Sequence, residues 1–203
     1  MNALVWLTFP KTKRAISAGH VALGANKDGP SHPSATSNGR HPCATSNGRH
    51  HRATPHRRPR RRDVLTLFDE AGIIILSQCD ELRNMHEAHQ WRTLFVNHRQ
   101  DFLCAARPIL FGHGALEQLA SNPHRGLTVK ALWLPLPPDS SAAEIDSYFA
   151  AQINEDTLLT ETERRLALPL LGIPGWFAEN EDPSCYDDEE VFRAQPSRRM
   201  IER

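Results

Sequence analysis

The sequence offers little support for a disulfide framework or a structural zinc site. It has four cysteines in 203 residues, they are widely separated, and no two form a C-x-x-C pair (Cys43, Cys79, Cys104 and Cys185). Disulfide-rich secreted domains and zinc sites both need closely spaced cysteines. The cysteine content is instead typical of a protein that folds in a reducing compartment, and we expect a cytoplasmic location.

Long apolar runs and the common glycine-rich motifs are also missing. The apolar stretch at residues 3–9 is far shorter than the roughly twenty residues of a membrane span. A signal peptide carries its positive charges before the apolar stretch, whereas Lys11 and Lys13 follow it here. No Walker A loop, G-x-G-x-x-G or G-x-S-x-G occurs, so P-loop, Rossmann and serine-hydrolase-elbow sites are unsupported. We expect a soluble protein with no membrane partner.

Charge is unevenly distributed along the chain. The formal net charge is zero, yet residues 31–62 hold eight arginines and no acidic residue. The 141 residues that follow hold 12 basic and 23 acidic side chains, and an acidic body argues against nucleic acid as the main partner. The arginine tract could neutralise phosphates, but it lacks the interleaved aromatic residues that stack on bases. A nucleic-acid partner is therefore disfavoured.

Residues 25–61 differ in composition from the rest of the chain. The heptapeptide Ala-Thr-Ser-Asn-Gly-Arg-His occurs at residues 35–41 and again, unchanged, at 44–50. This repeat is too short and too polar to bury a face, and Pro, Gly, Ser, His and Arg dominate around it. We predict three parts: an N-terminal helical segment of the core at 1–24, a disordered Arg/His/Pro-rich insert at 25–61, and the main part of a single α+β domain at 62–203.

Apolar periodicity predicts an α+β fold, with a small antiparallel sheet built on a β-hairpin and packed with several helices. At residues 64–76, two apolar runs flank Asp-Glu-Ala-Gly, which is typical of a hairpin turn. Further strands are predicted at 107–111 and 127–134. Apolar spacing and two capping boxes predict helices at residues 2–7, 11–23, 77–89, 115–120, 142–154 and 161–171. A mostly α fold is the alternative.

Three polar residues in these segments form the centre of a candidate site. Asp69 and Glu70 are adjacent carboxylates, which can bind a metal or act as general acid and base. Aspartate before glycine is also an ordinary turn sequence. His113 lies between two glycines at a strand-to-helix junction, where a base or a metal ligand is well placed and a ligand can approach the backbone.

Three further residues complete the candidate set. His20, on the N-terminal helical segment, is a second potential base or ligand, and Lys13 and Arg62 could hold an anionic group of a substrate. His86 and His89 superficially resemble the histidine pair of a metalloprotease helix, but they are three residues apart rather than four, so that motif is not matched. The sequence leaves the identity of any metal or cofactor open.

Five ordered segments carry a family resemblance. They are residues 2–10 with Lys13 and His20, residues 62–72 (with Leu-Thr-Leu-Phe-Asp-Glu-Ala-Gly), residues 91–95, residues 111–117 (Phe-Gly-His-Gly-Ala-Leu-Glu), and residues 172–176 with 186–188 and 192–193. Together they resemble an uncharacterised proteobacterial family, catalogued as domain of unknown function number three thousand and twenty-five. The resemblance implies a soluble bacterial protein with no assigned activity. It also implies that this chain is truncated at its N-terminus, where relatives carry a Trp-His-Asp segment, and that its low-complexity insert is unusually long.

The sequence leaves open whether the chain is an enzyme. In one interpretation it is a hydrolase-like enzyme acting on an unknown small molecule, with His113 and His20 as base or ligand. Asp69 and Glu70 would then orient or ligate. In the other, a non-catalytic binding or structural module, the same residues form turns, caps and buried networks. The two interpretations differ in whether these four side chains converge on one pocket.

Overall fold

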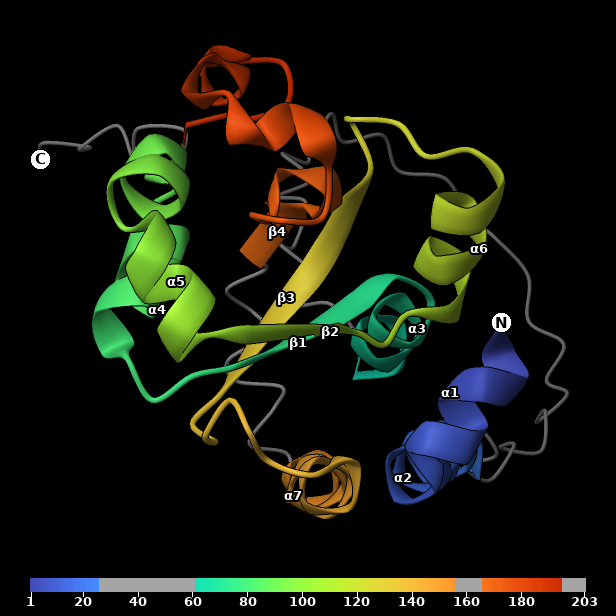
Figure 1. Cartoon of the computed structure of the whole chain (residues 1–203). Helices are drawn as coiled ribbons and strands as arrows, with labels where there is room; N and C mark the ends of the chain where they lie inside the picture. Colours follow the sequence, from blue (N-terminus) through green and yellow to red (C-terminus); the bar gives the residue numbers. More distant parts are fainter. Residues whose placement is uncertain (26–60, 156–165, 195–203) are drawn as a thin grey trace, which may run out of the picture.

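The computed structural model describes residues 1–25, 61–155 and 166–194, and these residues form an α+β structure (Figure 1). The α-helices are α1 (Asn2–Thr8), α2 (Pro10–Ala25), α3 (Arg61–Ala71), α4 (Asp80–Glu87), α5 (Arg99–Ala105), α6 (His113–Ser121) and α7 (Ala142–Asn154). Shorter helical turns are the π-helical η1 (Thr93–Asn97) and the 3-10 turns η2 (Leu170–Gly172), η3 (Ala178–Glu181) and η4 (Pro183–Asp187). The predicted fold class is confirmed.

The centre of the fold is a four-stranded sheet in the order β2–β1–β3–β4. Strand β1 (Gly72–Leu76) pairs antiparallel with β2 (Arg107–Leu110) and parallel with β3 (Thr128–Leu134). Strand β3 in turn pairs antiparallel with β4 (Leu166–Pro169). The sheet is therefore mixed rather than purely antiparallel, because the connection from β1 to β3 crosses over by way of α4, α5, β2 and α6.

The predicted β-hairpin at residues 64–76 is wrong. Its first half is helix α3, and only its second half is a strand, β1. Leu65 and Phe68 are both buried, at 5% exposure, and their spacing of three places them on one helical face. A Cβ atom on Gly72 would clash with the Phe68 carbonyl oxygen, so the glycine allows the chain to leave the helix and enter the strand directly.

Two other predictions need comment. The helix predicted at residues 161–171 is wrong where the structure describes it, because residues 166–169 form β4, which pairs with β3. Its capping box, like nearly all of the predicted disordered insert at 25–61, lies outside the described residues. At the edges of that insert, Ala25 is the last residue of α2 and Arg61 is the first residue of α3.

The sheet separates two apolar clusters. Ile73 and Ile75 of β1 face the cluster formed with α4, η1, α5 and the C-terminal turns, whereas Ile74 and Leu76 face the cluster formed with α1, α2, α3 and α7. Figure 1 shows α4 and α5 on the opposite side of the sheet from α2 and α7. All of β1 is buried, as expected for a central strand covered on both faces. Within the described ranges, no helix combines the length and apolar content that crossing a bilayer requires.

Candidate functional site

The candidate site lies where the end of α3 meets the beginning of α6. Gly112 joins β2 to α6, and its backbone N–H donates to the Gly72 carbonyl oxygen at 2.7 Å. A Cβ atom on Gly112 would lie 2.5 Å from the Gly72 nitrogen and 2.6 Å from the Glu70 carbonyl oxygen. On Gly114 it would lie 3.1 Å from that same oxygen. The two glycines therefore let the chain around His113 press directly against the end of α3.

This contact fixes the His113 ring. The Nδ1 atom lies 2.8 Å from the backbone carbonyl oxygen of Asp69, and a carbonyl oxygen can only accept a hydrogen bond. Nδ1 therefore carries the hydrogen, and in the neutral ring Nε2 keeps a free lone pair. The His113 side chain is 25% exposed, so Nε2 belongs to a ring that is held firmly and still reached by solvent.

Lys13, on α2, brings a buried positive charge to the same place. Its Nζ lies 2.5 Å from Asp69 Oδ1, and its side chain is 4% exposed against 21% for Asp69. The ammonium also lies 5.7 Å from the ring centroid of Trp6 and 6.0 Å from that of Phe111. A buried ammonium is costly unless it is paired, and the carboxylate together with the two aromatic faces provides that pairing.

The three polar residues thus form one connected cluster. Asp69 contacts Lys13 through Oδ1, and its other oxygen, Oδ2, lies 3.8 Å from His113 Nδ1. The cluster therefore places Nε2 of the fixed His113 ring next to the Lys13–Asp69 ion pair. Among the residues the structure describes, no group of three or more His, Cys, Asp or Glu side chains is arranged to hold a metal ion.

The remaining predicted residues are not drawn into this cluster. The Glu70 side chain is exposed, and only its backbone contacts the glycines around His113. His20 is half-buried on α2, seven residues after Lys13, which corresponds to about 10 Å along the helix. In the described part of the chain, no residue hydrogen-bonds to the Glu70 carboxylate or to the His20 ring. The side chain of Arg62 lies outside the described residues. The cluster therefore contains Lys13 and two of the four proposed catalytic residues.

The pair His86 and His89 is not a joint site. His86 is completely buried, accepts a hydrogen bond at Nδ1 from Trp133 Nε1 at 2.8 Å, and donates from Nε2 to the Ala167 carbonyl oxygen at 3.4 Å. Burial lowers the pKa of His86 from 6.5 to about 4, so the ring is neutral near pH 7. His89 instead donates from Nδ1 to the Arg193 carbonyl oxygen at 3.2 Å. His86 links α4 to the sheet as a core residue.

One residue that positions the site was not identified from the sequence. Asp146 lies inside α7, is 3% exposed, and accepts hydrogen bonds from the backbone N–H groups of Lys11 and Thr12 at 2.9 and 2.8 Å. It thereby caps the N-terminus of α2, the helix that carries Lys13. The available signal was indirect: α2 begins at Pro10, and the residue before it, Phe9, is not one of the usual capping residues Ser, Thr, Asp and Asn.

Comparison with known proteins gives a family but no activity. Neither a curated protein nor a solved structure matches the chain. A family model described as Protein of unknown function (DUF3025) matches residues 34–196, a range that includes Asp69 and His113, whereas Lys13 and His20 precede it. The match covers well over half of the chain, and the chain therefore belongs to this family of proteins of unknown function.

Proposed function

We propose that the chain is a hydrolase-like enzyme in which His113 acts as the general base. The observation that supports this proposal is the 2.8 Å hydrogen bond from His113 Nδ1 to the Asp69 carbonyl oxygen. A general base needs a fixed orientation and a lone pair within reach of the proton that it removes. The hydrogen bond supplies the first, and the partial exposure of the ring supplies the second.

The other candidate residues take supporting roles in this proposal. Asp69 is a positioning residue, because its carbonyl group holds His113 while its carboxylate holds Lys13. Lys13 is the proposed contact for an anionic group of the substrate, which would compete with the Asp69 carboxylate for the Lys13 ammonium. Glu70, exposed on the last turn of α3, is the proposed second carboxylate, and His20 is the proposed second base or ligand. Arg62 keeps the role proposed from the sequence, which is to hold an anionic group of the substrate. An anionic ester, either a phosphoester or a carboxylic ester, is the class of substrate that suits this arrangement.

One observation favours the alternative, a non-catalytic module. Both charges of the Lys13–Asp69 pair are already balanced within the protein, and the cluster ties α2, α3 and α6 together. A cluster whose only role is to connect helices would look the same. The two proposals therefore have to be separated by activity rather than by geometry.

The test compares the purified protein with His113→Asn on panels of phosphoesters and carboxylic esters. An asparagine amide at position 113 can still donate to the Asp69 carbonyl group, but it has no basic nitrogen, so the fold is expected to survive. We expect kcat to fall about 100- to 10,000-fold, as for loss of a general base. His98→Asn is the matched control, because the His98 ring is on the surface and pairs with Asp101 at 2.9 Å.

Two results would contradict the enzyme proposal. One is the absence of turnover by the unaltered protein on every substrate of both panels. The other is turnover by His113→Asn that equals that of His98→Asn. In either case the cluster at His113 would be assigned to the non-catalytic role.

A further inference from the structure

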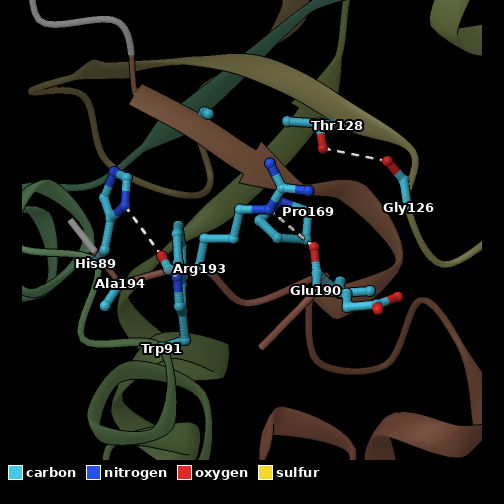
Figure 2. A pocket seen from close by; sticks show the side chains of 10 residues that line it. His89, Trp91, Gly126, Thr128, Pro169, Glu190, Arg193 and Ala194 are labelled. Atoms are coloured by element: carbon cyan, nitrogen blue, oxygen red, sulfur yellow. Dashed lines mark hydrogen bonds between the residues drawn. The ribbon is translucent and has the colours of Figure 1, made fainter. Parts of the chain in front are cut away.

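A second site is suggested by a pocket of about 510 Å³ beside strand β4. Figure 2 shows it from close by. Its walls come from the connection between α4 and η1, from the start of β3, from β4 and from the chain after η4, with His89, Trp91, Thr128, Pro169, Glu190 and Arg193 among its lining residues. None of these residues belongs to the cluster around His113, so the pocket is separate from the proposed catalytic site.

Two rings of the pocket are held in place by one carbonyl group. The Arg193 carbonyl oxygen accepts hydrogen bonds from Trp91 Nε1 at 2.9 Å and from His89 Nδ1 at 3.2 Å. Trp91 is 5% exposed and stacks on Phe95 at 6.1 Å between ring centroids, which leaves it little freedom to move. Because Nδ1 of His89 carries the hydrogen, its Nε2 remains available as an acceptor in the neutral ring.

The backbone at His89 is unusual. Its φ angle is +53°, in the left-handed region, where non-glycine residues are uncommon and strain is often retained at functional sites. Here the conformation allows the chain to turn sharply after α4, so that the ring of His89 lies against that of Trp91, with 5.1 Å between their centroids. The turn therefore builds one wall of the pocket.

Arg193 contributes a cation that forms no ion pair with any of the residues described in the structure. Its Nε donates to the Glu190 carbonyl oxygen at 3.1 Å, which fixes the side chain, and no described residue accepts a hydrogen bond from its Nη groups. Thr128 and Pro169 line the same pocket, and Figure 2 shows the Glu190 carboxylate pointing away from the Arg193 guanidinium group. A planar guanidinium fork with free Nη groups matches the oxygens of a carboxylate, phosphate or sulfonate.

We propose that this pocket binds a small anionic molecule that has a flat apolar ring. The anionic group would pair with the Nη groups of Arg193, and the ring would pack against Trp91, Pro169 and Val191. The volume of the pocket falls within the range of about 300–1,000 Å³ that is usual for small-molecule sites. Mostly apolar walls with a few fixed polar groups are also typical of such sites. The inference does not depend on the proposed hydrolase activity.

The experiment uses two fluorescent probes that share one apolar body. 1-Anilinonaphthalene-8-sulfonate carries a negative charge, and N-phenyl-1-naphthylamine lacks it. Titration of the full chain is expected to show saturable binding of the sulfonate at a single site. Arg193→Gln should weaken binding of the sulfonate about tenfold or more, since a charge-assisted contact is lost, and should leave the neutral amine within about twofold. Glu190→Gln should change the affinity for the sulfonate in the opposite direction, because it removes a nearby negative charge.

Further variants keep the test decisive. Arg83→Gln, which removes a cation of α4 that pairs with Glu87, is the matched control and should leave both probes unaffected. Ala194→Trp should fill the pocket and abolish binding of both probes, and near-ultraviolet circular dichroism would verify that each variant is folded. Binding of the sulfonate that is unchanged by both Arg193→Gln and Ala194→Trp would overturn the proposal. Equal loss in Arg193→Gln and Arg83→Gln would overturn it as well.

Discussion

The ion pair between Lys13 and Asp69 is expected to be strongly coupled. With 2.5 Å between Nζ and Oδ1, the direct attraction at an effective dielectric constant of about 20 is about 7 kcal/mol. Much of this offsets the cost of removing both charges from water. Lys13→Met leaves the carboxylate without its partner, and loss of one partner from a buried pair costs about 3–5 kcal/mol. Because the Asp69 side chain is 21% exposed, we expect a cost at the lower end of this range, about 3 kcal/mol.

A double-mutant cycle measures the coupling itself. Urea unfolding gives the free energy of unfolding for Lys13→Met, for Asp69→Asn and for the double variant, which should recover at least about 1 kcal/mol relative to additivity. The control cycle uses Arg92 and Asp187, whose ion-paired side chains are 53% and 60% exposed and whose coupling should be within about 1 kcal/mol of zero. A Lys13–Asp69 coupling no larger than that of the control pair would refute this account of the cluster.

Three other substitutions test the framework of the fold and of the site. Gly112→Ala should lower the free energy of unfolding in urea by about 3 kcal/mol, because the added Cβ meets backbone atoms at 2.5 Å. The control, Gly126→Ala, has its nearest contact at 3.5 Å and should change the free energy of unfolding by no more than about 0.5 kcal/mol. Similar losses in the two variants would argue against the tight contact at Gly112. The pKa of His86 is lowered to about 4, so the unfolded chain takes up a proton that the folded protein does not. The contribution of His86 to the free energy of unfolding should therefore be fully present above about pH 6.5 and fall by about 3 kcal/mol towards pH 4. In His86→Gln, the midpoint of urea unfolding should depend less on pH across this range. An unchanged pH dependence of the midpoint would contradict this explanation. Asp146→Ala removes both hydrogen bonds to the start of α2 and should cost about 2–3 kcal/mol, which thermal unfolding would detect as a clear fall in Tm; an unchanged Tm would mean that another group caps the helix.

Elements with a local chemical signature could be predicted from the sequence. The capping box of α7 is an example: the Ser141 side chain accepts from the Glu144 backbone N–H, and Glu144 accepts from the Ser141 backbone N–H. The strands at β2 and β3 were also found, because short apolar runs bounded by Gly or Pro have few other interpretations. In these cases the information is contained within a few neighbouring residues.

The segment that forms α3 shows why the rest could not be predicted. Apolar residues at positions 64, 65, 67 and 68 suit a strand followed by a turn as well as a helix, so local spacing does not decide. Long-range packing decides it: Leu65 lies against Gly19 of α2, and Phe68 packs against Phe111 and Phe149, with ring centroids 5.4 and 5.3 Å away. These partners come from three distant parts of the chain.

The candidate site was partly predictable for a similar reason. His113, Asp69 and Lys13 could be selected by residue type, because charged and basic side chains in distinctive segments are natural candidates. The hydrogen bond that fixes the His113 ring could not be found this way, since its acceptor is the backbone carbonyl of Asp69 and every residue carries a carbonyl group. A search for paired side chains would have given that role to the carboxylate.

This use of the backbone provides a way to separate the two proposed functions. Asp69→Asn keeps the carbonyl group that holds His113 but removes the negative charge that holds Lys13. If His113 is the general base, Asp69→Asn should lose stability while kcat stays within about tenfold, and His113→Asn should lose kcat while keeping most of its stability. If the cluster only connects helices, the two variants should show these same stabilities, but His113→Asn should not lower kcat on any substrate. Asp69→Asn would lose stability and keep kcat, and His113→Asn would lose kcat and keep stability. This combination can arise only when stability depends on the carboxylate of residue 69 and catalysis depends on the ring that its carbonyl group orients.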